Sequence, residues 1–171
     1  TQMHGKGTSV DRRLGGEQFA VAQKSGAGDT RAEKDLVTAK LAALHFYQLA
    51  IPAPTPPDGS FDKAAAGRGE AVFNGKAKCA RCHVPPLFSE PGWPMHTAEE
   101  IGIDDFQSSR SPDKLYRTTP LAGLFARSKG GFYHDGRFAD LPAVVQHYER
   151  VFNLGLTEAE RGDLVEYLKS L

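Results

Sequence analysis

The sequence lacks a net charge and a long apolar run, and it has few cysteines. Its 171 residues include 21 basic and 21 acidic side chains, so the formal charge is zero. This balance offers no broad electrostatic surface for nucleic acid or for an anionic membrane. No apolar run approaches the roughly 18 residues needed to cross a bilayer. We therefore expect no nucleic-acid partner and no membrane span.

The only two cysteines lie in one pentapeptide, CARCH, which holds Cys79, Cys82 and His83. A zinc site needs four ligands and the chain has no third cysteine, while a redox C-x-x-C has no use for a histidine directly after it. The spacing C-x-x-C-H is the attachment motif of c-type haem. Each thiol forms a thioether with a porphyrin vinyl group, and the adjacent imidazole is the proximal iron ligand. The motif predicts one covalently bound haem c.

The expected compartment follows from the thiol chemistry. Haem c is attached where thiols are handled outside the cytoplasm, and the motif uses both cysteines. The chain starts at Thr1 and has no apolar segment of the signal-peptide type. We therefore expect that a signal peptide has been removed and that the protein is periplasmic.

Composition divides the chain into an N-terminal extension, residues 1–59, and a haem domain, residues 60–171. Residues 1–34 are polar and glycine-rich and should be irregular, whereas residues 35–50 favour an amphipathic helix. Prolines between positions 52 and 57 end this helix and predict a stiff connector. The segment after the motif, residues 84–137, is rich in proline and glycine and should pass around the porphyrin.

Three helices are expected in the haem domain. Residues 62–73 are alanine-rich, and Asn74-Gly75 suits a left-handed C-terminal cap. Asp140 can cap a second helix with an apolar stripe of Val144, Tyr148 and Val151. The fold class is all-α.

The last helix has the clearest signals. Thr157 and Glu160 form a capping box, and Leu164, Leu168 and Leu171 share one face. We expect this face to pack on helix 62–73 and to close the haem pocket.

A helix before C-x-x-C-H and an amphipathic terminal helix resemble the class I cytochrome c architecture. Residues 68–171 further resemble the C-terminal haem domain of the bacterial di-haem cytochrome c peroxidase and MauG family. The resemblance rests on the stretches GRGEAVFNGKAKCARCHVPPLFSE, YRTTPLAGLFARSKGGFYHDGRFADLPAVVQHY and LGLTEAERGDLVEYLKSL. Two features differ from the family. This chain has one C-x-x-C-H instead of two, and the loop before residues 132–136 lacks a Thr and a Pro of the family's calcium site.

The sixth iron position is the main open question. In the family this ligand lies 14 positions after the histidine that corresponds to His134; it is a methionine in the peroxidases and a tyrosine in MauG. The resemblance therefore implies Tyr148, which can equally be a buried aromatic residue. Met95 and His147 stay as alternatives. The resemblance also implies that Arg117 pairs with a haem propionate.

Several polar residues favour ordinary structural roles. Asp135 precedes a glycine, which is turn chemistry, so His134 and Asp135 are interpreted as a turn rather than an acid–base pair. His96 is interpreted as a hydrogen-bonding anchor of the loop after the motif.

Two functions are compatible with these features. The first is a mono-haem electron carrier with both axial positions filled, which works with a redox protein partner. The alternative is a peroxidase-type oxidoreductase, or the haem-bearing part of one, which needs a displaceable sixth ligand and an acid–base group. The single haem motif favours the carrier, because di-haem peroxidases draw one electron from each haem.

Overall fold

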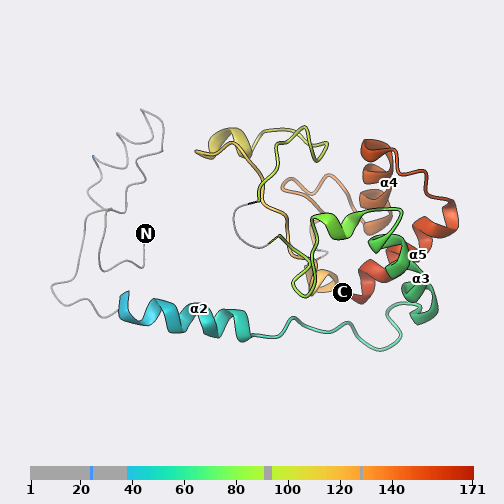
Figure 1. Ribbon diagram of the computed structural model, residues 1–171, viewed down its shortest axis with the longest axis horizontal. Coiled ribbons are helices and arrows are strands. Elements are labelled where there is room, and N and C mark those ends of the chain that lie inside the picture. Colours follow the sequence, from blue (N-terminus) through green and yellow to red (C-terminus); the bar gives the residue numbers. More distant parts are fainter. Residues whose placement is uncertain (1–23, 25–37, 91–93, 128) are drawn as a thin grey trace. The chain divides into compact units, whose positions relative to one another are not determined.

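The computed structural model describes residues 24, 38–90, 94–127 and 129–171. Among these residues the regular elements are helices, and β pairing is limited to two isolated bridges, His96 with Tyr116 and Phe132 with Phe138. The expected all-α class is confirmed at this level (Figure 1). None of the described helices is long and apolar enough to span a bilayer.

The chain divides into two compact units, with α2 in the first and α3, α4 and α5 in the second. α2, Leu41–Ala50, continues the short 3-10 helix Thr38–Lys40. It ends at the extended residue Ile51 because Pro52 disfavours the helical conformation there. Most of the N-terminal extension, including the start of the expected helix 35–50, lies outside the described residues.

α2 does not bury an apolar face, contrary to the expected amphipathic pattern. None of its residues is buried, and Phe46 is 74% exposed. The physical reason is its sequence, in which apolar side chains surround the helix instead of following one stripe.

α3, Lys63–Asn74, begins where the sequence predicts. The Asp62 carboxylate accepts hydrogen bonds from the backbone N–H groups of Ala64 and Ala65 at 2.8 and 3.0 Å. The predicted left-handed cap is wrong, since Gly75 has φ −102° and donates its N–H to the Ala71 carbonyl. The left-handed residue is Lys78, φ 56°, where the chain turns into the haem motif. The turn thus lies three residues later than predicted.

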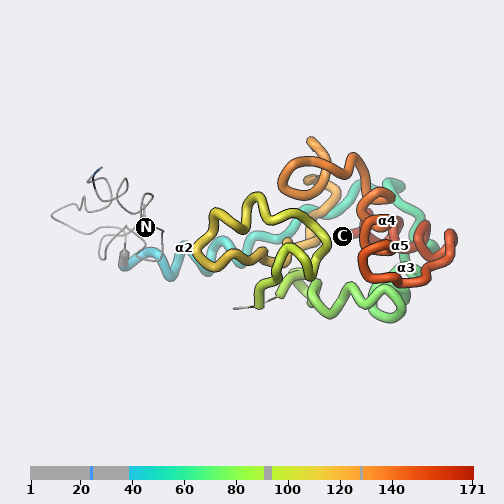
Figure 2. The backbone as a smooth tube through the Cα atoms, turned by 90° about the horizontal axis from the view of Figure 1, so that it is seen from above, coloured from blue at the N-terminus to red at the C-terminus, as the bar shows by residue number. Residues whose placement is uncertain are grey.

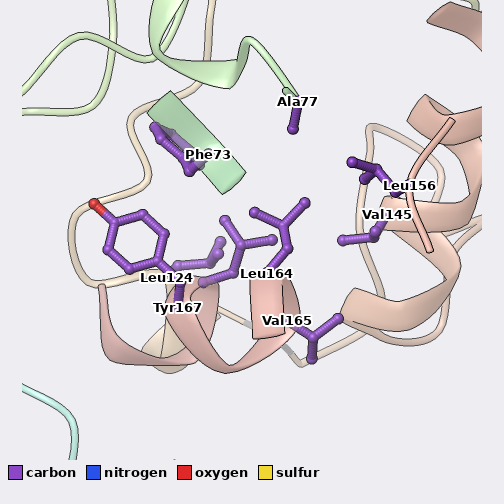
Figure 3. Close-up of a cluster of buried hydrophobic side chains, with 9 residues drawn as sticks. Phe73, Ala77, Leu124, Val145, Leu156, Leu164, Val165 and Tyr167 are labelled. Carbon is purple, nitrogen blue, oxygen red and sulfur yellow. The ribbon is translucent and has the colours of Figure 1, made fainter. Parts of the chain in front are cut away.

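α5, Glu158–Ser170, packs against α3 in close backbone contact, as predicted. A Cβ atom at Gly69 would lie 2.0 Å from the Asp163 carbonyl oxygen, so only glycine fits at this crossing. Phe73 is 1% exposed, and its ring meets the Tyr167 ring edge-on at 5.2 Å (Figure 3). The Arg68 guanidinium pairs with the Asp163 carboxylate at 2.6 Å beside the contact.

α4, Leu141–Phe152, lies beside α5 and closes the same core (Figure 2). Its cap is the predicted one, because Asp140 accepts a hydrogen bond from Ala143 at 2.9 Å. The predicted apolar stripe is right in part: Val144 and Tyr148 are half-buried, but Val151 is 37% exposed. The fully buried residue of this helix is Val145. Val151 lies six positions along the helix from Val145, which turns it by roughly 120° away from the core.

The core joins α3, α4, α5 and the 3-10 helix Leu124–Arg127. Its buried residues are Phe73, Ala77, Leu124, Val145, Leu156, Leu164, Val165, Tyr167 and Leu168.

The predicted capping box at the start of α5 is confirmed. The Thr157 hydroxyl accepts a hydrogen bond from the Glu160 N–H at 3.2 Å, while the Glu160 carboxylate accepts one from the Thr157 N–H at 2.7 Å.

Candidate functional site

The pentapeptide forms one tight turn directly after α3. Cys79–Arg81 is a 3-10 helix, and the N–H groups of Cys82 and His83 both donate to the Cys79 carbonyl, at 3.2 and 2.9 Å. Both cysteines are free thiols and half-buried. One turn of backbone thus holds two thiols and one imidazole together.

The thiols have the wrong electrostatics for a redox dithiol. Burial raises the pKa of the Cys79 thiol to about 11 and also raises that of Cys82, with the nearby Glu90 carboxylate adding to the effect. A redox C-x-x-C instead lowers the pKa of one thiol to make it nucleophilic.

The imidazole of His83 is oriented by the backbone. Its Nδ1 lies 2.9 Å from the Phe88 carbonyl oxygen, which can only accept, so the proton belongs on Nδ1 and Nε2 keeps its lone pair. Burial lowers the pKa of His83, against the opposing effect of the Phe88 and Thr119 backbone groups, which keeps the ring neutral at neutral pH. A neutral histidine whose second nitrogen is hydrogen-bonded is the usual form of a metal ligand.

A polar network beside the motif was missed by the sequence reasoning. The Glu90 carboxylate accepts hydrogen bonds from the Thr118 hydroxyl and from His96 Nε2, the latter at 2.6 Å. Burial acts to raise the pKa of Glu90, but the hydrogen bonds from Thr118 and His96 outweigh it and hold that pKa low. His96 is thus a loop anchor, as predicted. The role of Glu90 could not be predicted from the sequence, because its partners lie 6 and 28 residues away and follow no regular spacing.

Ligand-type atoms of Cys82, Glu90 and His96 lie within 4.8 Å of one another. The thioether predicted at Cys82 leaves no thiolate for a second metal there. The hydrogen bonds already satisfy Glu90, so the cluster is better described as a structural support of the motif.

Tyr148 is brought close to the motif by α4. Burial raises the pKa of its phenol, and the thiols of Cys79 and Cys82 are near enough to raise it further. Its ring stacks on Phe152 at 5.6 Å with an interplanar angle of 5°. The Tyr148 phenol therefore lies near the motif thiols.

The other two candidates are placed differently. His147 has Nε2 3.4 Å from the Ile101 carbonyl, and its ring packs on Phe138 at 4.8 Å. Met95 is half-buried and directly precedes the bridge residue His96. Arg117 is exposed between Tyr116 and Thr118, next to the Glu90 network.

His134 and Asp135 form a turn, as predicted, and are not paired as an acid and a base. His134 Nε2 lies 3.3 Å from Asp104, while Asp135 binds the Arg137 guanidinium at 2.8 Å. Hydrogen bonding from Arg137 lowers the pKa of Asp135 to about 2. Arg137 also pairs with Asp104, so the guanidinium supplies positive charge between the two carboxylates.

Comparison with known proteins adds to this geometry. No family model matches the chain. The methylamine utilization protein MauG of Methylorubrum extorquens is 31% identical over 155 residues, covering 79% of this chain and 43% of MauG. The cytochrome-c peroxidase IdrP1 of Denitromonas iodatirespirans is 29% identical over 157 residues, covering 64% of this chain and 42% of IdrP1. The chain resembles the MauG and cytochrome c peroxidase family.

This MauG-like chain spans less than half the length of both curated relatives. Among solved structures, a chain of Kuenenia stuttgartiensis hydrazine synthase superposes with a TM-score of 0.48 at 24% identity. That superposition covers 90% of the MauG-like chain and 62% of the other.

Proposed function

We propose that the chain is a mono-haem c-type cytochrome that transfers electrons. One haem c is bound through thioethers at Cys79 and Cys82, with His83 on the iron, in a class I cytochrome c-like domain of residues 60–171. The observation that carries the proposal is the C-x-x-C-H turn, in which both thiols are free and His83 Nδ1 is bonded to the Phe88 carbonyl. Because haem c attachment takes place outside the cytoplasm, we place the protein in the periplasm.

The donor set fits such a haem. The thiols are half-buried and unpaired, and the imidazole is neutral with Nε2 available to a metal. The Tyr133 hydroxyl is buried without a hydrogen-bond partner among the described residues, and its ring lies beside that of Tyr148. Two thiols and a neutral imidazole within one turn match the donor set of haem c.

The haem, when bound, supplies one-electron chemistry, and the protein residues set its environment. The contact of α3 with α5 excludes water behind the motif. The Phe88 carbonyl fixes the orientation of His83 and makes it a stronger donor. Tyr148 is our choice for the sixth ligand, with Met95 and His147 as alternatives, and we assign Arg117 to pair with a propionate. Filling both axial positions favours transfer over catalysis, and the donor and acceptor are redox proteins.

A second function, peroxide handling, is favoured by the names of the two relatives, one of which is a cytochrome-c peroxidase. It requires that Tyr148 leave its position during turnover and that a second electron come from another protein. Peroxide handling would be recognised by the hydrogen-peroxide-dependent oxidation of a reduced donor protein. Reversible one-electron reduction, with a ferric spectrum unchanged by hydrogen peroxide, distinguishes the carrier.

Haem attachment is tested by substitution within the motif. We expect Cys79→Ala combined with Cys82→Ala to lose all haem on acid–acetone extraction, because no thioether remains. The matched control is Arg81→Ala, which changes an exposed residue of the same turn and should keep the haem on the chain. Equal haem retention in both variants would refute the covalent site.

A further inference from the structure

The Tyr133 hydroxyl is a buried polar group that the fold itself does not use. Its oxygen is inaccessible to solvent and has no hydrogen-bond partner among the described residues. Leaving a buried hydroxyl unpaired is unfavourable, so such a group in a well-packed site calls for an explanation. Replacing the side chain by phenylalanine would keep the ring and remove the unfavourable group.

The backbone at Tyr133 has an unfavourable conformation. Tyr133 has φ 69°, a left-handed conformation that non-glycine residues seldom adopt. The turn around it is closed by the bond from Phe132 N–H to the Phe138 carbonyl at 2.7 Å. Gly131 lies so close to the returning chain that a Cβ atom there would be 2.5 Å from the Gly136 carbonyl oxygen. Strained residues held this firmly are concentrated at functional sites.

The ring of Tyr133 is directed to α4, where it faces Tyr148. The two ring centroids are 6.3 Å apart, and Tyr133 is also packed edge-on against Phe138 at 4.9 Å. A phenolate oxygen can only accept a hydrogen bond, whereas the unpaired hydroxyl of Tyr133 has a proton to donate. Tyr133 is therefore the donor of the pair and Tyr148 the acceptor.

We propose that the Tyr133 hydroxyl donates a hydrogen bond to the Tyr148 oxygen when that oxygen binds the haem iron. Tyr133 is then a positioning residue for the sixth ligand. The inference rests on the proposed function, since it needs both the haem and Tyr148 on the iron. The donated bond withdraws electron density from the phenolate oxygen, weakens its preference for Fe(III) and gives the buried hydroxyl the partner that it lacks.

The test compares the haem-loaded wild type with Tyr133→Phe. Removing the donor should shift the phenolate-to-iron charge-transfer band to longer wavelength. The midpoint potential should fall by about 59 mV, equivalent to a tenfold stronger preference of the phenolate for Fe(III). The matched control is Tyr167→Phe, which removes a phenol hydroxyl from the α3 and α5 contact and should change neither quantity.

The outcomes separate this inference from the function on which it rests. Wild-type protein without covalent haem overturns both. A covalent haem without a phenolate band overturns the Tyr133 inference alone. The Tyr133 inference is also overturned if the band and the potential are unchanged in Tyr133→Phe, or if they change equally in Tyr167→Phe. Neither result contradicts the haem site. Retention of one haem per chain shows that the Tyr133→Phe protein is folded.

Discussion

Replacing Gly69 by alanine should separate α3 from α5 at their closest approach. The new Cβ atom would lie 2.0 Å from the Asp163 carbonyl oxygen and 2.8 Å from the Tyr167 Cβ, where ordinary contacts begin at 3.4 Å. Both neighbours are backbone or backbone-proximal atoms, so no flexible side chain can move aside. Relief requires the helices to part by more than 1 Å. We expect a loss of about 1–3 kcal/mol in the free energy of unfolding, in the range of other overpacked cores.

Gly67 provides the matched control, two residues earlier in the same helix. A Cβ atom there meets nothing within 4 Å. Alanine at this position should stabilise the helix by about 0.8–1.0 kcal/mol, since glycine is a poor helix former. Urea unfolding of the haem-loaded proteins, followed by circular dichroism, measures both variants. Equal midpoints for Gly69→Ala and Gly67→Ala would refute the close crossing.

Three further predictions concern the core, the surface and the iron. Leu168→Ala should lower the free energy of unfolding by roughly 2–5 kcal/mol, as measured by urea unfolding, because this side chain is buried in the α5 contact. Lys76 and the cap of α5 lower the pKa of Glu160 to about 2, so its stabilising effect is present above its unfolded pKa of about 4.3 and is lost as the pH falls towards 2. Glu160→Gln should flatten this part of an acid-unfolding curve, and an unchanged curve would contradict the assignment. Tyr148→Phe should remove any phenolate charge-transfer absorption and open the site to small ligands, whereas Met95→Leu should leave the ferric spectrum unchanged. The opposite pair of spectra would move the ligand to Met95.

The helix starts could be predicted from the sequence because caps act over three residues. Asp62, Asp140 and the pair Thr157 and Glu160 bond to N–H groups two or three positions away, within reach of a local pattern. The cap at Gly75 failed because the backbone there continues into the haem motif and turns only at Lys78. The sequence therefore predicted the first residues of helices better than their last residues.

The environment of the site was less accessible from the sequence. The motif identified Cys79, Cys82 and His83, but the carbonyl that orients His83 comes from Phe88, whose side chain gives no hint of a backbone role. The unpaired hydroxyl of Tyr133 depends on packing against α4, which no spacing rule describes. Contacts of this kind depend on how the irregular segment returns to the helices.

The most direct test of the central claim is the intact mass of the denatured protein, expressed together with a cytochrome c maturation system. The account predicts the mass of the polypeptide plus one haem, and a haem-bearing peptide that contains Cys79 and Cys82. A mass equal to the bare polypeptide, with all colour lost on denaturation, would contradict it.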